Sequence, residues 1–369
     1  MKKIGCITFH ASHNYGSNLQ AYALQQFIVN NFDCTYEIIN LRTKKQLNMY
    51  NLCFNKKDVK SILKSIVYYR YRKDLIIKYD KYENFINNKL NISKKKFEDI
   101  NSLKNNKFDY DCCISGSDQI WNLSPSDFDW SYYLEFIDSC TKISYAASFG
   151  PVKQNWTDIE RNRIKDDLLN YNYISVREKG SFDNVKNLVK LSPSINVDPT
   201  LLLSSNEWDI IVNKVKFQDG EYIFFYDLKN DKDTYKLVKK ISKILNIPVV
   251  VAQESKYSIF STFIKRFDAG PEDYLNLIKN AKLVLSTSFH GNVFAIIFKK
   301  PFFAINGDKD YRINSLLKTI GLDNRTINNS NYVEKLNSAY NINYSNVTTI
   351  LNEEKKKSTD FLNNAINNK

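Results

Sequence analysis

Short apolar runs alternate with amphipathic segments along most of this 369-residue chain. The run Ile4–Phe9 has the length of a strand, and the segment Leu19–Val29 that follows it has the apolar spacing of a helix. Alternation of this kind predicts parallel sheets whose faces are covered by helices, and therefore an α/β fold. The further predicted strands are Tyr36–Leu41, Tyr110–Ile114, Ile143–Ala147, Tyr173–Val176, Tyr222–Tyr226, Pro248–Ala252, Leu283–Ser286 and Pro301–Ile305, and helical patterns between them include Glu160–Leu169, Tyr235–Leu245 and Glu272–Asn280.

The pattern divides in two after Asp198-Pro199-Thr200, in the polar stretch from Ser204 to Gly220. A chain of this length accommodates two domains of ordinary size, about 100–200 residues each. We expect two Rossmann-like domains that face a cleft, formed by residues 1–205 and 206–346. Residues 347–369 are predicted to form a final helix that can cross back to the first domain.

The composition is that of a globular protein, with 43% hydrophobic and 25% charged residues, and it excludes wholesale disorder. No stretch approaches the ~18 apolar residues of a membrane span. The apolar run behind Lys2 and Lys3 stops at His10, too early for a signal peptide. Six cysteines without C-x-x-C spacing are typical of free thiols in a reducing compartment, so we expect a cytoplasmic protein.

The positive charge of the chain is concentrated in one segment. The net charge is +13, and residues 42–107 hold 18 Lys or Arg and 6 Asp or Glu. Apolar positions recur every three to four residues from Val59 to Ile86, which indicates a basic helical insert in the first domain. A solvated basic face is the first interpretation. Attraction to an anionic membrane, at the inner face of the plasma membrane, is the second, and nucleic acid, for which no recognised motif is present, is the third.

The strongest local signal for chemistry is Ser286-Thr287-Ser288-Phe289-His290-Gly291, between an apolar strand and the helical run Val293–Phe298. A strand that leads into a helix presents free backbone N–H groups and the positive end of the helix dipole, and anions bind there. His290 lies in this turn and can donate a proton beside a bound anion. The alternative is a structural histidine that caps the turn.

Two other strands end in polar turns. Arg177 can hold a carboxylate or phosphate through two parallel hydrogen bonds, or form a surface pair with Glu178. Asp118, within Gly116-Ser117-Asp118-Gln119, can accept a hydroxyl proton or orient a sugar, although such a sequence is often a plain turn. Because ligands of open α/β sheets bind at the carboxyl ends of strands, the three turns are expected to converge.

Several other kinds of site lack support. His10, His13 and Cys6 have no carboxylate or fourth ligand nearby, so the pattern favours a loop over a metal site and no metal is expected. The sequence contains no Walker loop, no G-x-G-x-x-G and no G-x-S-x-G motif. Nucleotide hydrolysis and serine hydrolysis are therefore not indicated.

In its motifs the chain resembles the polysaccharide pyruvyl transferase family. The resemblance runs from Asn14 to about Leu322 and leaves out the basic segment and the tail. Each motif is loose alone, but their order and spacing together are specific. In chain order they are Asn14-Tyr15-Gly16-Ser17-Asn18-Leu19-Gln20, Gly116-Ser117-Asp118-Gln119-Ile120-Trp121-Asn122, Ser144-Tyr145-Ala146-Ala147-Ser148-Phe149-Gly150, Val176-Arg177-Glu178, Val197-Asp198-Pro199-Thr200, Ser288-Phe289-His290-Gly291 and the stretch from Arg312 to Leu322.

The resemblance implies a GT-B-like fold, phosphoenolpyruvate as donor substrate and a sugar as acceptor. Members of the family attach pyruvate to two hydroxyls of one sugar as a cyclic ketal and release phosphate, and no cofactor is expected. The family's functional histidine corresponds to His290, its donor-binding arginine to Arg177 and an aspartate to Asp118. Some members carry Arg where this chain has Ser288, and Arg312 is expected to supply that cation. The other expected substrate-binding residues are Ser117, Gln119 and Asn18.

Two other functions remain open on the sequence. A GT-B glycosyltransferase that uses a nucleotide-sugar shares the expected architecture, and a fold does not fix a function. A non-catalytic, membrane-associated scaffold would make use of the basic segment alone. For the pyruvyl transferase, a lipid-linked or polymeric sugar precursor is the expected acceptor, an anionic membrane surface is a candidate partner through residues 42–107, and nucleic acid is not an expected partner.

Overall fold

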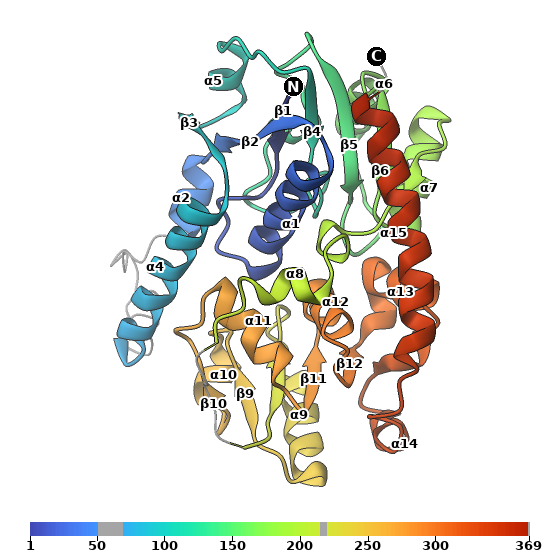
Figure 1. Ribbon diagram of the computed structural model, residues 1–369. Helices are drawn as coiled ribbons and strands as arrows, with labels where there is room; N and C mark the ends of the chain where they lie inside the picture. The colour runs from blue at the N-terminus through green and yellow to red at the C-terminus, as the bar shows by residue number, and fades with distance from the viewer. Residues whose placement is uncertain (51–68, 215–219, 368–369) are drawn as a thin grey trace.

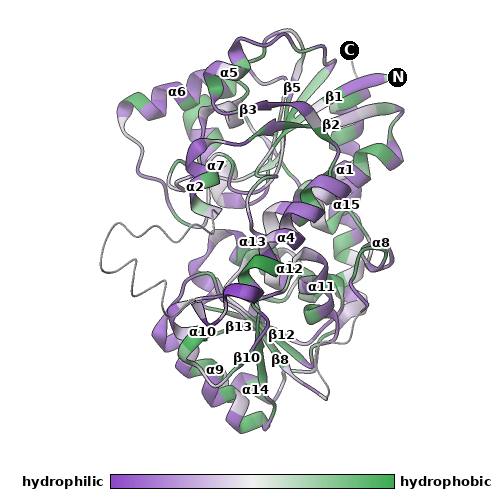
Figure 2. Cartoon of the chain, turned by 90° about the vertical axis from the view of Figure 1, so that its left-hand side faces the viewer, coloured by the Kyte–Doolittle hydropathy of each residue, from purple (hydrophilic) through white to green (hydrophobic). Residues whose placement is uncertain are grey.

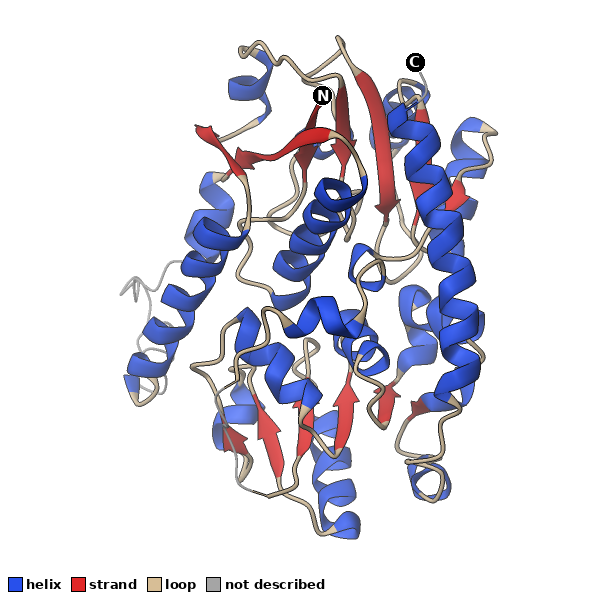
Figure 3. Cartoon of the chain, in the orientation of Figure 1, coloured by secondary structure: helices blue, strands red, loops and turns tan. Residues whose placement is uncertain are grey.

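The computed structural model describes residues 1–50, 69–214 and 220–367, which form two β-sheets, one in each half of the chain (Figures 1 and 3). Every pair of neighbouring strands within these residues is parallel. The α/β class with two Rossmann-like domains is therefore confirmed. The first sheet has the order β3(Ile92–Phe97), β2(Cys34–Leu41), β1(Lys2–Ile7), β4(Cys112–Ser115), β5(Thr141–Ala147), β6(Tyr173–Val176), β7(Ser194–Ile195), and the second has β10(Ile264–Lys265), β9(Val249–Val251), β8(Ile223–Tyr226), β11(Leu283–Ser286), β12(Phe302–Ile305), β13(Thr326–Ile327).

Helices connect most of the strands, and Figure 3 shows them packed around both sheets. In the first half of the chain they are α1(Tyr15–Asn31), α2(Lys44–Tyr50), α4(Arg72–Lys89), α5(Ile100–Lys104), α6(Asp158–Leu169) and α7(Lys179–Val189). In the second half they are α8(Ser205–Asp209), α9(Lys232–Leu245), α10(Lys256–Phe260), α11(Pro271–Lys279), α12(Phe289–Ile297), α13(Tyr311–Thr319), α14(Tyr332–Leu336) and α15(Tyr344–Asn367). Among the described residues, no helix has both the length and the apolar character that crossing a membrane requires.

The two domains share an apolar interface. Helices α1, α11 and α12 lie between the two sheets and pack against one another (Figure 1). Trp208 of α8 is fully buried there, with its ring centroid 5.8 Å from that of Tyr22 in α1 and 4.9 Å from that of Phe294 in α12. Because buried residues of both sheets join one core at this point, the domains are held against each other by the hydrophobic effect.

Each predicted strand lies within two residues of an observed one, but four observed strands were not predicted. These four, β3, β7, β10 and β13, are the outermost strands of the two sheets. An edge strand packs less apolar surface, and three of these are only two residues long. β3, with the sequence Ile-Ser-Lys-Lys-Lys-Phe, carries three exposed lysines and therefore lacks the apolar run on which the prediction depends.

The basic segment 42–107 is only partly helical, which corrects the prediction of a helical insert. Its described residues form α2, α4 and α5, but they also form β3, a strand of the first sheet. Residues 51–68, in the middle of the segment, lie outside the described residues. The amphipathic spacing correctly predicted the helix α4. The strand β3 was not predicted, because it forms by pairing with β2, which is distant in sequence.

Helix α4 contacts both domains. At its C-terminal end Phe85 and Ile86 are buried in the core of the first domain. At its N-terminal end Leu75 joins the core of the second domain, where Nζ of Lys78 donates to the carbonyl of Ala252 at 3.2 Å. The basic segment therefore holds the two domains together along one side (Figure 1).

Helix α15 returns from the second domain to the first (Figure 1). Its residues Leu362, Ala365 and Ile366 are buried in the same core as strands β1 and β4. The backbone N–H of Val197 donates to Oγ of Ser358 at 3.0 Å. The last two residues of the segment predicted as a final helix, 368 and 369, lie outside the described part of the chain.

Replacing Leu362 with Ala should destabilise the protein by about 2–5 kcal/mol, because the side chain is fully buried where α15 meets the first domain. Urea unfolding followed by tryptophan fluorescence measures the change. Leu169→Ala in α6 is the control, since Leu169 is 54% exposed and its truncation should cost much less. Equal costs for the two variants would show that α15 does not pack on the first domain as described.

Candidate active site

The carboxyl ends of the two sheets face each other. In Figure 3 the strand arrows of the first sheet point toward those of the second. In each sheet the order reverses next to the first strand, between β1 and β4 and between β8 and β11. Ligands of open α/β sheets bind at such switch points, outside the carboxyl ends of the strands. The turns after β4, β6 and β11 all lead into the space between the two sheets.

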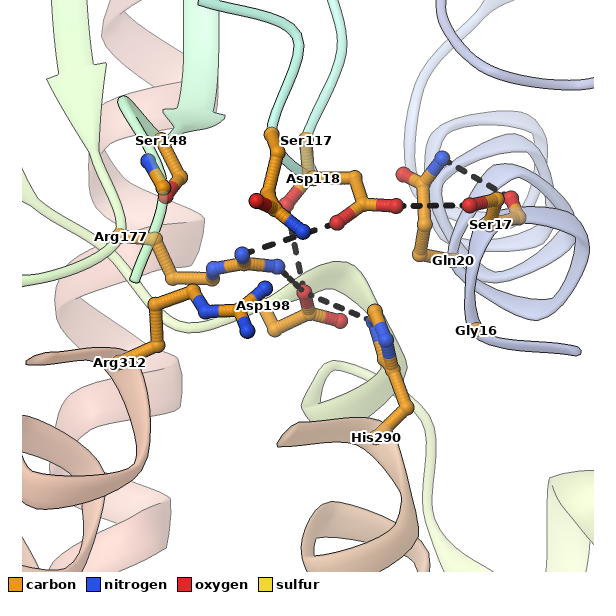
Figure 4. Close-up of polar contacts among 12 residues, drawn as sticks. Gly16, Ser17, Gln20, Ser117, Asp118, Ser148, Arg177, Asp198, His290 and Arg312 are labelled. Atoms are coloured by element: carbon orange, nitrogen blue, oxygen red, sulfur yellow. Dashed lines mark hydrogen bonds and ion pairs between the residues drawn. The ribbon is translucent and has the colours of Figure 1, made fainter. Parts of the chain in front are cut away.

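The carboxylate of Asp198 lies at the centre of this site (Figure 4). Its Oδ2 accepts a hydrogen bond from Nη1 of Arg177 at 2.6 Å and one from Oγ of Ser117 at 3.3 Å, and it lies 3.4 Å from Nε2 of His290. Its Oδ1 accepts from the backbone N–H and the hydroxyl of Thr200. Burial opposes ionisation, but the charges and hydrogen bonds of His290 and Arg177 outweigh it and hold the pKa of Asp198 well below its ordinary value.

Arg177 is a buried cation among carboxylates. Besides its bond to Asp198, its Nη2 lies 3.7 Å from Oδ1 of Asp118 and its Nε lies 3.5 Å from Oε2 of Glu178. Burial alone would lower the pKa of Arg177, but the three acids raise it, so the side chain stays charged. Its guanidinium carbon lies 4.4 Å from the ring centroid of Phe289, a favourable cation–π contact. The Nε and Nη2 groups make no hydrogen bond, and each lies within ion-pair distance of a carboxylate.

A second arginine faces the same aromatic ring. Arg312, at the start of α13, has its guanidinium carbon 5.9 Å from the ring centroid of Phe289. Its Nε and Nη2 donate to the two carboxylate oxygens of Asp310 at 3.0 and 2.7 Å, which fixes the orientation of the guanidinium plane. Arg177 and Arg312 together line a pocket that also includes Asp198. Two arginines over one ring form an arrangement that suits a ligand with two anionic groups.

His290 is the second residue of α12 and points toward Asp198 (Figure 4). The first turn of α1 packs directly against it. A Cβ atom placed on Gly16 would lie 2.0 Å from Nδ1 of His290, a distance that real Cβ atoms do not show. Gly16 is therefore required by the position of the imidazole, which belongs to the other domain.

Asp118 lies in the turn after β4, with a positive φ of 75° that is strained for a residue other than glycine. Its Oδ2 accepts a hydrogen bond from Oγ of Ser17 at 2.8 Å (Figure 4). The carboxylate is thus held between α1 and Arg177. This position is close to His290 but separated from it by Asp198.

The other predicted substrate-binding residues differ in their position relative to Asp198. The hydroxyl of Ser117 lies within hydrogen-bond distance of Oδ2 of Asp198 and of the carbonyl of Ala146, and it can donate its one proton to either, so Ser117 borders the centre of the site. Ser288 is the N-cap residue of α12 and is buried. Gln119 accepts from Nδ2 of Asn122 at 3.0 Å, and the contacts of its side chain lie within its own turn.

Asn18 lies in α1 and is fully buried. Its Nδ2 donates to the carbonyl of His10 at 2.7 Å, while its Oδ1 has no hydrogen-bond partner. Among the described residues, no group of three or more His, Cys, Asp or Glu side chains is arranged to hold a metal ion.

Sequence reasoning missed the residues that connect the predicted ones. Asp198 was noticed only as part of a motif, although an Asp-Pro pair after an extended segment was a signal for a polar turn. Phe289 precedes His290 and its ring supports both arginines, but an aromatic residue at the start of a helix is usually core. The partner of Arg312, Asp310, is two residues away and could have been read as an Asp-x-Arg pair.

Several solved structures with a similar fold are named for UDP or for UDP-GlcNAc 2-epimerase. The S. aureus MnaA–UDP co-structure is 11% identical with a TM-score of 0.55, and the match covers 100% of this chain and 97% of that one. UDP-GlcNAc 2-epimerase from Neisseria meningitidis bound to UDP-GlcNAc is 12% identical, with a TM-score of 0.50 and coverage of 98% and 99%. The enzyme from Methanocaldococcus jannaschii is 12% identical, with a TM-score of 0.51 and coverage of 93% and 94%. At such identities the likeness concerns the fold alone: this is a GT-B-like α/β protein.

The sequence assigns the chain to a family, which the similarity in fold does not. The family model for polysaccharide pyruvyl transferase matches residues 14–309, and the chain belongs to that family of transferases. The match spans the basic segment, which the motif comparison had left outside the resemblance, and it ends before Arg312. No curated protein matches the chain significantly.

Gly16→Ala should destabilise the protein by about 1–3 kcal/mol, the usual cost of an overpacked core. Alanine in a helix normally stabilises a protein by about 1 kcal/mol relative to glycine. A lower free energy of unfolding in Gly16→Ala would therefore identify the clash with His290. In a His290→Ala background the same substitution should cost little or become stabilising. Urea midpoints of the four proteins measure both effects, and an equal cost in both backgrounds would contradict the contact.

Burial lowers the pKa of His10 from its ordinary value of 6.5 to about 4, although hydrogen bonds to Thr8 and Asn40 oppose this in part. Between those two pH values the folded chain binds fewer protons than the unfolded chain, so stability should fall as the pH falls from 6.5 to 4. His10→Gln should flatten this part of the profile of unfolding free energy against pH. An unchanged slope in His10→Gln would show that other groups cause it.

Proposed function

We propose that this protein transfers pyruvate from phosphoenolpyruvate to two hydroxyls of one sugar in a surface-polysaccharide precursor, forming a cyclic ketal and releasing phosphate. Family membership supports the reaction class. The observation that carries the proposal is the cluster of Arg177, Arg312 and His290 around Phe289 and Asp198, built from both domains at the carboxyl ends of the sheets.

The donor is a small anion with a carboxylate and a phosphate, and the pocket offers a cation for each. Arg177 has two N–H groups without hydrogen-bond partners, and Arg312 is held in a fixed plane by Asp310. The N-terminus of α12 begins at the same place and adds free backbone N–H groups. These groups are preorganised, so binding an anion there needs little rearrangement.

His290 is the proposed acid. Protonation of C3 of the enol makes C2 electrophilic, and a sugar hydroxyl then bonds to C2. Asp198, whose lowered pKa keeps it ionised, lies 3.4 Å from Nε2 of His290 and orients the imidazole. The C2–O bond to phosphate breaks and the second hydroxyl bonds to C2. Of the two hydroxyl protons, one restores His290 and the other leaves with phosphate, and Asp118 is placed to relay a proton.

A glycosyltransferase that uses a nucleotide-sugar is the second candidate, because enzymes that bind UDP or UDP-GlcNAc share the fold. At the switch point of the second sheet, Asp227 follows β8, is buried, and accepts a hydrogen bond from Oγ1 of Thr287 at 2.7 Å. At the switch point of the first sheet, Asp118 follows β4. Because carboxylates lie at both switch points, the identity of the bound donor is what distinguishes the two candidates. A non-catalytic scaffold is the remaining alternative.

Thermal unfolding with phosphoenolpyruvate and, separately, with UDP- and GDP-sugars distinguishes these candidates. A ligand at ~100 times its dissociation constant adds about 2.7 kcal/mol, enough for a shift of a few degrees. Phosphoenolpyruvate should stabilise the protein, and Arg177→Ala and Arg312→Lys should remove the shift. Arg161→Ala is the control, because Arg161 is exposed on α6. Stabilisation by a nucleotide-sugar alone would overturn the proposal.

The role of His290 is tested on the same proteins. His290→Gln should keep the stabilisation by phosphoenolpyruvate but lower phosphate release about 10²–10⁴-fold, the usual contribution of a general acid. Phosphate release is measured with phosphoenolpyruvate and a panel of methyl glycosides that have free hydroxyls at C3, C4 and C6. Normal turnover in His290→Gln would exclude this residue as the acid. If the native protein is folded but neither binds phosphoenolpyruvate nor releases phosphate, the non-catalytic scaffold is favoured.

A further inference from the structure

The cations of α4 fall into two sets that lie on opposite faces of the helix. Lys78 and Lys81 face the second domain, where Lys78 pairs with Glu254 at 2.7 Å and Lys81 with Asp273 at 2.6 Å. Arg72 and Lys73 are exposed and have no ion pair with any residue that the structure describes. The inner set is neutralised by the fold, so the charge of the outer set is available to a partner.

Large apolar side chains lie beside this outer set. Tyr69 is 69% exposed, Ile76 39% and Ile77 43%. Positions 72, 73, 76 and 77 share one face of the helix, because residues three and four apart are neighbours on its surface. We call this surface the α4 patch, and it consists of Tyr69, Arg70, Arg72, Lys73, Ile76 and Ile77.

The patch is on the outside of the molecule. Figure 2 shows the side on which α4 lies across both domains, with α4 toward the viewer. One exposed acid, Asp80, lies on the same face one turn further along. The N-terminal part of the face is therefore both cationic and apolar, whereas its C-terminal part carries the amides Asn84 and Asn87.

We propose that the α4 patch docks the protein on a membrane surface that contains anionic lipids. Basic residues beside isoleucine and tyrosine on one exposed helix face are typical of helices that lie in the membrane interface. A nucleic acid would satisfy the arginines and lysines but not the paired isoleucines, whereas the interface of an anionic bilayer offers both negative charge and an apolar layer. The segment 42–107, which holds 18 Lys or Arg against 6 Asp or Glu, adds a long-range attraction of the same sign.

The helix that carries the patch also contacts the first turn of α1, which borders the candidate active site. On the opposite face of α4, Nζ of Lys78 is 5.2 Å from the ring centroid of Tyr15. Tyr15 is followed by Gly16, which abuts His290. The docking itself does not depend on the proposed reaction.

Co-sedimentation of the full-length protein with phosphatidylglycerol vesicles, and with phosphatidylcholine vesicles for comparison, tests the proposal. Binding is expected to the anionic vesicles and not to the zwitterionic ones. Arg72→Gln/Lys73→Gln should weaken it about 25-fold (about 2 kcal/mol, at ~1 kcal/mol per basic residue). Ile76→Ser/Ile77→Ser should weaken it about tenfold, because half-exposed apolar side chains enter the interface.

Matched controls separate the patch from a general effect of charge or hydrophobicity. Lys239→Gln/Lys240→Gln removes two exposed cations from α9, and Ile210→Ser/Ile244→Ser removes two exposed isoleucines elsewhere. Neither should change vesicle binding by more than about twofold. Equal losses in the patch and control variants, or no binding to anionic vesicles, would overturn the proposal. So would a concentration-dependent dimer in sedimentation velocity that Ile76→Ser/Ile77→Ser abolishes, since a second copy would then cover the patch.

Stabilisation by phosphoenolpyruvate, measured without vesicles, keeps the two proposals apart. Vesicle binding without a response to phosphoenolpyruvate would support docking and count against the reaction. A thermal shift with phosphoenolpyruvate but no vesicle binding would support the reaction and count against docking. The patch variants should retain the full thermal shift with phosphoenolpyruvate, because none of their residues lies in the donor pocket.

Discussion

One carboxylate oxygen, Oδ2 of Asp198, binds the buried guanidinium of Arg177 and faces the imidazole of His290. Arg177 follows a strand of the first sheet and His290 follows a strand of the second. Bringing two such groups together inside a protein is unfavourable unless a negative charge lies between them, because a buried cation without a partner costs several kcal/mol. The charge of Asp198 is in turn stabilised by the N–H and hydroxyl of Thr200. The pair of Asp198 and His290 therefore belongs both to the site and to the contact between the domains.

The remaining geometry follows from close packing around that centre. Gly16 lets the first turn of α1 approach His290, and the ring of Phe289 supports both Arg177 and Arg312. Both guanidinium groups thus lie against an apolar ring, and each is also paired with a carboxylate, Asp198 for Arg177 and Asp310 for Arg312. A site built in this way holds its cations in place before a ligand arrives.

Much of this arrangement was accessible from the sequence, for physical reasons that can be stated. The inner strands were predicted because each is buried on both faces and reads as an apolar run, whereas the edge strand β3 carries three lysines and does not. His290, Arg177 and Asp118 were found because each follows such a run directly. Asp198 was missed as a site residue because it acts through contacts with residues 21 and 92 positions away, Arg177 and His290, which no local pattern records.

The sequence by itself determined the alternation of strands and helices, the two parallel sheets, the family and the polar turns at the strand ends. These are local properties, set by apolar periodicity and by residue types at fixed spacing. Only the tertiary structure decided that Asp198 neutralises the site, that Gly16 makes room for His290, and that α4 and α15 each connect the two domains. Each of these depends on contacts between residues far apart in the chain, and the energy of such contacts is defined only once folding has brought both partners out of water.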